Sequence, residues 1–406
     1  MVLSQVLEFA PERDAEVFAA VKEAPAVFAM RGEPGAEPYV SKTANLRRRL
    51  QRLLAPPAPN SKRLNLRGHV RTIEYAVTGS DFESGLLLYR VLRREFPRNY
   101  AARLRWRPAP LLRLVLENEY PRVTVTTRIA TLRGRSLYYG PFPARAVAEK
   151  FANDALDFFN LRRCTDDLHP DPAFPGCIYS QMKMCLAPCF RGCTDGEYRA
   201  EVERVQAFFD TRGQALLREL TAQREAASAA LEFENAAGLH LRLEKLNPLA
   251  AQIPEIVRRI DRLAGVIVQP SAELDTVVLF RIEAGQLNGP IPFPLQHKSA
   301  ERSSKPQSME SRISETLAAV PSLPLGTAVE TMEQLAYLKR WYYRSAQVGE
   351  VFFTDEKDEL PLRRLVRGIS RVSRGERPGG ELHETTADYW INRGKAAVLN
   401  PENYNV

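Results

Sequence analysis

Cysteine is scarce in this sequence and confined to one place. The chain of 406 residues has five cysteines, and all of them lie between Cys164 and Cys193. A disulfide-dense secreted scaffold is therefore excluded, because such scaffolds are small and stapled throughout. In a reducing compartment, clustered cysteines more often ligate a metal ion or a cluster than form disulfides. The cysteine segment therefore predicts one local centre.

Long apolar runs are also missing. No stretch approaches the roughly 20 apolar residues that cross a bilayer, and the first residues show no basic leader followed by an apolar run. We therefore expect a cytoplasmic protein without a membrane partner. The sequence also has no glycine-rich phosphate loop and no HExxH pair, so neither of these catalytic motifs is present.

Basic residues outnumber acidic residues, 57 against 49, and they are concentrated in two runs. Residues 42–52 carry five basic side chains and no acidic one, and residues 90–107 carry seven arginines against Glu95 alone, with Tyr100 and Trp106 among them. Such runs are typical of nucleic-acid binding, because each neutralised phosphate releases counterions. The alternative for a single run is a solvated helix face. The candidate contacts to double-stranded DNA are Lys42, Arg47, Arg48, Arg52, Arg94 and Arg98.

The pattern of strands, helices and turns predicts an α+β protein made of several units. Residues 20–105 predict a small unit of short strands and two helices, and residues 106–196 predict a connecting segment with further strands and the cysteines. Residues 197–260 have helical periodicity with little proline or glycine, which predicts a helical hairpin. Residues 265–375 predict a mixed unit of strands and helices, and residues 376–406 form a tail.

Spacing limits what the cysteines can hold. Cys164, Cys177, Cys185 and Cys189 are separated by twelve, seven and three residues, and Cys193 follows after three more. Zinc ribbons usually use two short CxxC turns, which are missing here, whereas an iron–sulfur cluster suits ligands that are more widely spread. Spacing alone leaves open an iron–sulfur cluster, a zinc site and unligated buried cysteines. A catalytic thiol is disfavoured, because no Cys/His/Asn arrangement accompanies it.

The string RRC…CIYSQMKMCLAPCFRG resembles the cysteine region of the UvrC family of excinucleases. Besides the cysteines, the match includes Tyr179, Gln181, Ala187 and Pro188. The resemblance implies a 4Fe–4S cluster, with zinc as the alternative, and leaves Cys193 as an extra residue. The implied ligands are Cys164, Cys177, Cys185 and Cys189.

The same family carries an N-terminal nuclease module of the GIY-YIG type, and residues 25–100 are similar to it through PAVFAM, YVSKTANLRRRL and PRNY. The resemblance implies that Tyr39 activates water and Arg49 contacts the scissile phosphate, while a glutamate holds magnesium. This sequence departs from the pattern at four positions, two of which are Ser41 in place of a glycine and Leu53 where a further tyrosine is expected. Phe28 replaces the first tyrosine, and Tyr89 stands where the family has the metal-binding glutamate.

Glu83 is the nearest candidate to replace that glutamate. It lies six residues before Tyr89, about 240° around the axis of the same predicted helix, so an undistorted helix points it elsewhere. Nuclease activity with magnesium therefore stays open. The alternative for Tyr39 and Arg49 is a strand aromatic and a basic helix residue that contact DNA without cutting it.

Residues 230–246, ALEFENAAGLHLRLEKL, resemble the UVR motif, a helical hairpin through which UvrC proteins dock on the helicase-like protein UvrB. The apolar positions recur at helical spacing, and two small residues allow close helix approach. For an isolated amphipathic helix, packing in an internal core is the alternative. The implied partner contacts are Leu231, Phe233, Ala236, Ala237 and Leu239.

Complete family members continue into an RNase H-like nuclease domain and a helix-hairpin-helix segment, and we find no string of either kind before Val406. We therefore expect a truncated homologue that acts in nucleotide excision repair and binds DNA and a UvrB-type partner. It would nick DNA only if its first module holds magnesium. The rival hypotheses are a non-catalytic adaptor with a degenerate nuclease site and a zinc-bearing nucleic-acid protein unrelated to repair.

Overall fold

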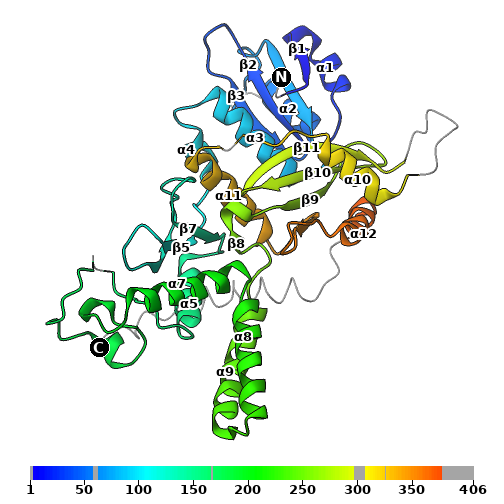
Figure 1. The fold of residues 1–406 in the computed structure, drawn as a ribbon. Helices are drawn as coiled ribbons and strands as arrows, with labels where there is room; N and C mark the ends of the chain where they lie inside the picture. Colours follow the sequence, from blue (N-terminus) through cyan, green and yellow to red (C-terminus); the bar gives the residue numbers. More distant parts are fainter. Residues whose placement is uncertain (1–2, 58–62, 166–167, 297–306, 325, 377–406) are drawn as a thin grey trace.

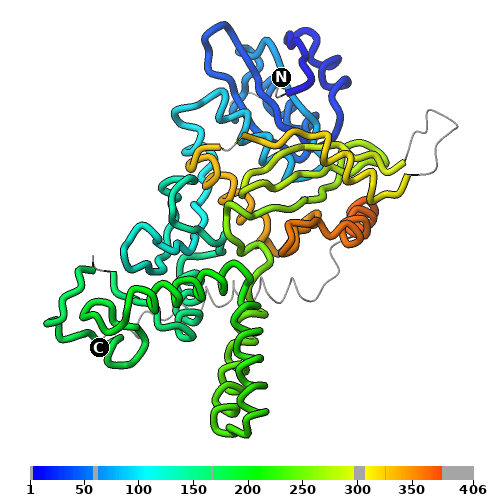
Figure 2. Tube along the Cα trace, viewed as in Figure 1, coloured from blue at the N-terminus to red at the C-terminus, as the bar shows by residue number. Residues whose placement is uncertain are grey.

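The computed structural model describes residues 3–57, 63–165, 168–296, 307–324 and 326–376. Within these ranges, three four-stranded antiparallel sheets are surrounded by helices, and a helical hairpin projects away from them (Figures 1 and 2). This combination confirms the predicted α+β class. The predicted tail lies outside the described residues apart from Glu376. No helix in the described ranges is both long enough and apolar enough to cross a membrane.

The first sheet has the strand order β1-β4-β2-β3. Its strands are β1 (Gln5–Glu8), β2 (Ala26–Arg31), β3 (Tyr39–Thr43) and β4 (Thr72–Val77). β1 pairs with β4 along its whole length, so the sheet includes residues that precede the predicted boundary at residue 20. β1 does not follow from the local sequence pattern, because this edge strand is mostly exposed and has no alternating apolar residues.

Helices cover both faces of the first sheet. α1 (Asp14–Ala20), preceded by a 3₁₀ turn (Pro11–Arg13), and α2 (Leu46–Leu54) pack on the face that contains Phe28 and Met30. α3 (Asp81–Glu95) packs on the opposite face, against Val27 and Ala29. Successive side chains of a strand point to opposite faces, so β2 is buried on both sides and reads as a continuous apolar run.

The local sequence fixes the orientation of α2. The side chain of Asn45 caps the helix by accepting a hydrogen bond from the backbone N–H of Arg48. Four leucines at helical spacing are buried, and Arg48 and Arg52 lie on the exposed face.

The second sheet has the order β6-β5-β7-β8 and precedes the cysteine segment. α4 (Tyr100–Leu104) leads into β5 (Leu111–Val115), β6 (Arg122–Thr126) and β7 (Leu137–Gly140), and α5 (Arg145–Leu156) packs on the sheet. The last strand, β8 (Arg258–Arg259), follows the helical hairpin in the chain and pairs with β7. The cysteine segment itself contains only α6 (Ile178–Gln181) and a 3₁₀ turn (Pro188–Phe190).

Three helices occupy the region in which the sequence predicted one hairpin. They are α7 (Asp195–Asp210), α8 (Gln214–Ala229) and α9 (Phe233–Ala251), and the projecting hairpin is α8 with α9 (Figure 1). The chain leaves α7 through Arg212 and Gly213, both of which have positive φ angles. A single glycine in a long helical pattern is a weak signal, so the sequence did not separate α7 from α8.

The third sheet has the order β11-β10-β9-β12. It contains β9 (Gly265–Pro270), which follows a 3₁₀ turn (Ile260–Arg262), then β10 (Thr276–Glu283), β11 (Gln286–Pro294) and β12 (Glu350–Phe353). α10 (Met309–Ala318) and α12 (Leu362–Ser373) pack on one face of this sheet. α11 (Ala328–Tyr342) packs on the opposite face, in a larger core that also includes α3 and the second sheet.

α11 packs closely against α3 of the first unit. A Cβ at Gly85 of α3 would lie only 2.3 Å from the phenol oxygen of Tyr337, so this contact requires glycine. The ring of Phe82 stacks on Tyr337 with centroids 5.3 Å apart. The first and third units therefore share a packed interface in which α3 is buried between the first sheet and α11.

Candidate functional site

The structure brings Tyr39 and Arg49 together. Tyr39 begins β3 and Arg49 lies on α2, where a terminal guanidinium nitrogen of Arg49 donates a hydrogen bond to the phenol oxygen of Tyr39 at 2.7 Å. The Nε atom of Arg49 is buried and has no hydrogen-bond partner in the described structure. The pair therefore retains an unused donor beside a phenol, which suits contact with an anionic oxygen.

Phe28 contributes packing beside this pair. Its ring is fully buried, and its centroid lies 6.1 Å from that of Tyr39. Phe28 faces Ser41 in the register of β2 and β3, and Leu53 is buried in the same core. The positions of this sequence that depart from the family pattern around Tyr39 are therefore occupied mainly by apolar core side chains.

Tyr89 is directed toward α11. It is 2% exposed, and its hydroxyl donates a hydrogen bond to Glu333 Oε2 at 2.9 Å and accepts one from Arg93 at 3.4 Å. Burial and the nearby Glu333 carboxylate raise the pKa of Tyr89, so the phenol stays protonated at neutral pH. Tyr89 therefore links two units of the protein.

Glu83 helps to form the start of α3. Its carboxylate accepts a hydrogen bond from the backbone N–H of Gly79 at 2.8 Å, and its own N–H donates to the N-cap hydroxyl of Ser80 at 3.0 Å. Burial raises the pKa of Glu83, although the bond from Gly79 opposes this shift. Within the described residues, neither Tyr39 nor Arg49 hydrogen-bonds or pairs with a carboxylate.

Six basic residues were predicted to contact DNA, and the structure divides them into two groups. Three form ion pairs: Lys42 with Asp81, Arg47 with Glu23 at 2.8 Å, and Arg94 with Glu95 at 2.7 Å. The other three are exposed and form no ion pair with any residue that the structure describes: Arg48, Arg52 and Arg98. The charges of the second group are not offset by a neighbouring carboxylate, so these arginines are free to pair with an external anion.

The cysteines predicted as ligands act electrostatically on two of their number, Cys185 and Cys189. The pKa of Cys185 is raised to about 11, chiefly by burial and to a smaller extent by the thiols of Cys164, Cys189 and Cys177. Burial also raises the pKa of Cys189, with added contributions from Cys177 and Cys164. Such influence falls off with distance, so these thiols lie in the same region of the cysteine segment. All five cysteines are free thiols.

Cys193 is the cysteine that the resemblance leaves outside the implied ligand set. Burial is the largest cause of the raised pKa of Cys193. The nearby charges of Glu197 and Asp195 raise this pKa further, and the thiol of Cys189 makes the smallest contribution. It stands directly before the cap of α7, where Thr194 and Glu197 form a capping box. In the described parts of the chain, no three cysteine, histidine, aspartate or glutamate side chains meet closely enough to bind a single metal ion.

Nitrogen donors point at two of the cysteine sulfurs. The backbone N–H of Ala187 donates to Cys185 Sγ at 3.3 Å, and the guanidinium of Arg162 donates to Cys164 Sγ at 3.5 Å. The N–H of Leu186 donates to the carbonyl oxygen of Asn160 at 2.9 Å. This hydrogen bond joins the stretch that follows Cys185 to the stretch that precedes Cys164. Four thiols with N–H donors form a set that is chemically suited to ligating iron–sulfur or zinc.

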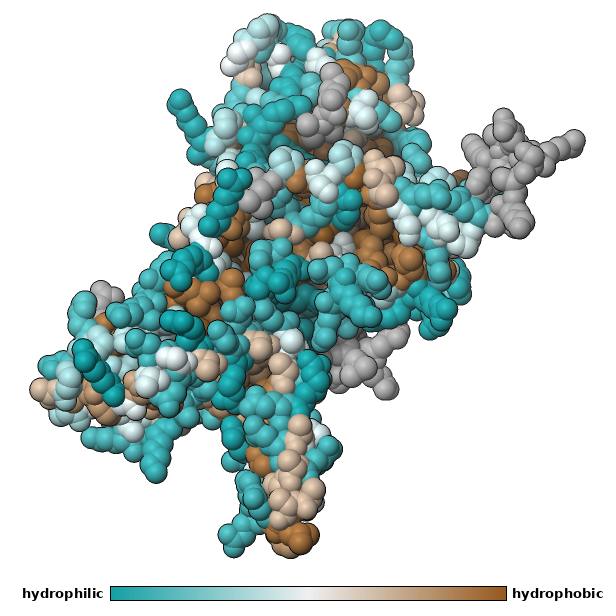
Figure 3. Space-filling model, in the orientation of Figure 1, coloured by the Kyte–Doolittle hydropathy of each residue, from teal (hydrophilic) through white to brown (hydrophobic). Residues whose placement is uncertain are grey.

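The tip of the α8–α9 hairpin carries exposed apolar side chains (Figure 3). Leu231 is 70% exposed and Phe233 is 68% exposed, and Ala237 lies beside them on the exposed surface. Further along α9, Leu239 is buried, and Ala236 is half-buried. The apolar stripe predicted from the sequence therefore divides into an exposed tip and an inner part that packs within the protein.

Two residues of these sites were not predicted from the sequence. Arg162 is 2% exposed, and its Nε donates to the carbonyl oxygen of Tyr120 at 2.8 Å. A charged residue two positions before a cysteine was a usable signal for it. Glu333 comes from α11, and no local pattern could have connected it with a tyrosine 244 residues earlier.

Part of this chain matches a known family model. Residues 110–208 match the model described as UvrC/Cho excinuclease, middle domain, and this range contains β5, β6 and β7 of the second sheet, the cysteine segment and most of α7. No solved structure matches the chain.

Similar proteins match a longer part of the chain. UvrABC system protein C of Carboxydothermus hydrogenoformans is 29% identical over 269 residues, which cover 66% of this chain and 43% of that protein. The protein of the same name from Alcanivorax borkumensis is 33% identical over 214 residues, covering 52% and 35%. That of Desulforudis audaxviator is 32% identical over 281 residues, covering 69% and 44%. The chain therefore spans less than half the length of these relatives.

Proposed function

Because this chain is a homologue of the UvrC excinucleases, we propose that it acts as a DNA-binding component of nucleotide excision repair. The observation that carries the proposal is the match of residues 110–208 to the UvrC/Cho middle domain, within which the four cysteines proposed as ligands lie. The exposed, unpaired arginines of the first unit support a DNA partner, because they keep their charge for phosphates.

We propose that the cysteine centre holds a 4Fe–4S cluster, with zinc as the alternative. When bound, such a cluster supplies metal–thiolate bonds that join separate turns of the chain. The segment between α5 and α7 contains only short helical turns, so these bonds would stand in for an extended core. The ligands would be Cys164, Cys177, Cys185 and Cys189, and the N–H groups of Ala187 and Arg162 would orient two of the sulfurs.

A UvrB-type protein is the proposed protein partner. The exposed tip around Leu231 and Phe233 projects from the rest of the molecule, which leaves it accessible to a partner helix (Figure 1). An exposed apolar patch of this kind is typical of a docking surface.

Two catalytic outcomes are compatible with this role. The hydrogen-bonded pair of Tyr39 and Arg49 would support nicking if the phenol accepted a proton, the guanidinium contacted a phosphate and a carboxylate held magnesium. The second candidate is an adaptor that binds DNA and its partner without cutting. The contact of Tyr89 with Glu333 favours the adaptor, because it uses the position of the expected metal ligand for packing.

Incubation of the full chain with labelled, damaged duplex DNA and magnesium or manganese tests these alternatives. Nicking that Arg49→Ala abolishes would support the nuclease, and Arg145→Ala, which alters an ion-paired surface arginine of α5, serves as the control. Tight binding without a nick in either metal would support the adaptor. A chain that bound no DNA would contradict the proposed function itself.

A further inference from the structure

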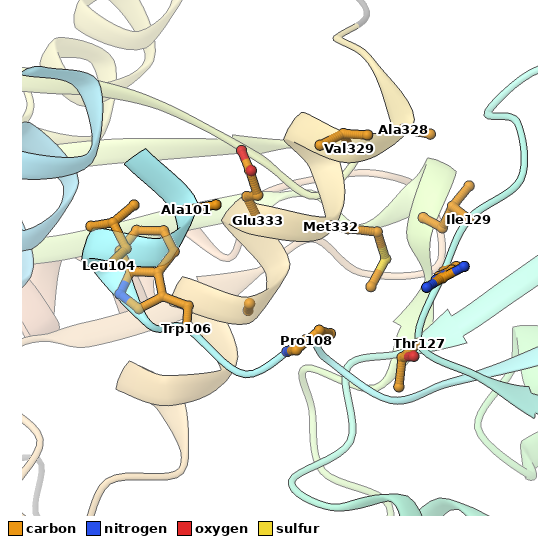
Figure 4. Close-up of a pocket in the computed structure, with 12 residues that line it drawn as sticks. Ala101, Leu104, Trp106, Pro108, Thr127, Ile129, Ala328, Val329, Met332 and Glu333 are labelled. Atoms are coloured by element: carbon orange, nitrogen blue, oxygen red, sulfur yellow. The ribbon is translucent and has the colours of Figure 1, made fainter. Parts of the chain in front are cut away.

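A cavity of about 310 Å³ lies where the three units meet (Figure 4). One wall comes from α4 and the segment Trp106–Pro108, the opposite wall from the loop Thr127–Ile129, and α11 closes the space between them. The lining is mainly apolar, and its larger side chains are Leu104, Trp106, Ile129, Val329 and Met332. This volume is at the lower end for small-ligand pockets, so it suits one ring system.

The walls of the cavity are held in place by the surrounding structure. The ring of Trp106 stacks on Tyr337 with centroids 4.8 Å apart and lies 5.3 Å from that of Tyr89. Lys339 of α11 donates to the carbonyl oxygens of Arg107 and Pro108 at 3.3 and 3.2 Å. The cavity is therefore formed before any ligand enters, which lowers the entropic cost of binding.

The charge distribution separates the interior of the cavity from its rim. Inside, the carboxylate of Glu333 already accepts hydrogen bonds from two phenols, so a phosphate would be repelled there. Arg128 is an exposed residue of the lining, and Arg105 and Arg107 are exposed on either side of Trp106 in the chain. None of these three arginines forms an ion pair within the described ranges. A neutral ring inside and an anionic chain outside match this pattern.

We propose that the cavity receives one unstacked nucleobase of a DNA strand whose phosphates lie on Arg105, Arg107 and Arg128. The inference rests on the proposed DNA binding and adds to it a preference for a base that has left the helix. The base would pack against the edge of Trp106, Ile129 and Met332, which replaces the stacking that it loses in the duplex. Damaged or mismatched bases leave the helix at lower cost, so the cavity would favour distorted DNA.

A pair of neighbouring alanines provides a test with a matched control. Ala101 lines the cavity, whereas Ala102 is exposed on the same helix and is not part of the lining. The full chain, Ala101→Phe and Ala102→Phe are compared for binding to a labelled duplex with one unpaired base and to the fully paired duplex. The wild type and Ala102→Phe should prefer the unpaired base by about tenfold, and Ala101→Phe should lose this preference while keeping its affinity for paired DNA.

A second measurement reports on the base directly. Replacing the unpaired base by 2-aminopurine, we expect the wild type, but not Ala101→Phe, to protect its fluorescence from quenching by acrylamide. Equal affinity of the wild type for the two duplexes, or equal quenching with the wild type and Ala101→Phe, would overturn the inference and leave DNA binding intact. The same result is expected if the cavity receives an apolar side chain of a protein partner. Failure to bind either duplex would overturn both proposals.

Discussion

The phenol of Tyr89 donates a hydrogen bond to the carboxylate of Glu333 at 2.9 Å, although 244 residues separate them in the chain. Tyr100 donates to the other oxygen of Glu333 at 2.7 Å. One carboxylate therefore holds α3 and α4 of the first half against α11. The helix position at which the resemblance places a metal-binding glutamate is part of an interface between units in this protein.

Tyr89→Glu is expected to destabilise the protein without creating nuclease activity. The new carboxylate would be buried beside Glu333, and two like charges in a buried site are unfavourable. We expect a loss of about 2–4 kcal/mol in the free energy of unfolding, measured by chemical denaturation. Tyr89→Phe is the control, since it removes one hydrogen bond and should cost about 1 kcal/mol. Magnesium-dependent nicking by Tyr89→Glu would show that this position still faces the catalytic residues.

Exposed and ion-paired arginines on α2 should differ in their contribution to DNA binding. Arg48 and Arg52 are exposed, whereas Arg47 forms an ion pair with Glu23 at 2.8 Å. If each exposed arginine contacts one phosphate, Arg48→Gln with Arg52→Gln should reduce the slope of log K against log salt by about 1.8. Arg47→Gln should change the slope much less. Identical slopes for the double variant and the wild type would place the DNA elsewhere.

The cysteine centre makes different predictions for Cys164 and Cys193. Cys164→Ser removes a proposed ligand, so protein purified without oxygen should lose most of its iron and its visible absorption. Cys193→Ser should keep both, because Cys193 is not one of the proposed ligands. Iron analysis and absorption spectra of the two variants check this. Loss of iron from Cys193→Ser but not from Cys164→Ser would show that Cys193, and not Cys164, is a ligand. One zinc ion per chain in the purified wild type, in place of iron, would show that the site holds zinc.

Two substitutions in the α8–α9 hairpin should affect different properties, one partner binding and the other stability. Phe233 is 68% exposed at the tip, so Phe233→Ala should weaken binding to a UvrB-type protein at least tenfold and leave the melting temperature unchanged. Leu239 is buried, so Leu239→Ala should lower stability by about 2–3 kcal/mol. Calorimetric binding and thermal melts of both variants separate the effects. Unchanged binding by Phe233→Ala would show that the partner does not contact the tip.

Much of the fold could be predicted from local patterns. The two helices of the first unit, α2 and α3, follow Asn45 and Ser80, which cap them, and their buried leucines recur at helical spacing. The strands β2, β5 and β10 are apolar runs bounded by turn residues, a pattern from which strands can be predicted. Each of these helices and strands is specified by residues that lie close together in the chain, so a local pattern is enough to predict it.

Other features depend on contacts that a local pattern does not contain. β1 is an exposed edge strand that exists because β4 offers it a hydrogen-bonding partner. The environment of Tyr89 depends on α11, and the short strand β8 depends on the return of the chain to β7. For the candidate site, the sequence identified Tyr39 and Arg49 as candidates, and their hydrogen bond follows from the packing of β3 on α2.

Glu83 gives a pH-dependent prediction. Burial raises its pKa, so the folded protein holds this proton more tightly than the unfolded chain does. At pH 8 the ionised carboxylate therefore costs stability, and this cost disappears as the pH falls through the raised pKa. Glu83→Gln keeps an oxygen that can accept the hydrogen bond from Gly79 and removes the charge. We expect its melting temperature to exceed that of the wild type by roughly 1–2 °C at pH 8, and the difference to shrink toward pH 5.

An exposed carboxylate provides the control for this pH dependence. Glu356→Gln alters a fully solvent-facing residue in the loop before α12, so its effect on the melting temperature should be small at both pH values. If Glu83→Gln were instead less stable than the wild type at pH 8, the ionised carboxylate would be stabilising the start of α3 through the helix dipole. If magnesium stabilised the wild type but not Glu83→Gln, Glu83 would be a metal ligand, and the assignment of this residue to helix capping alone would be wrong.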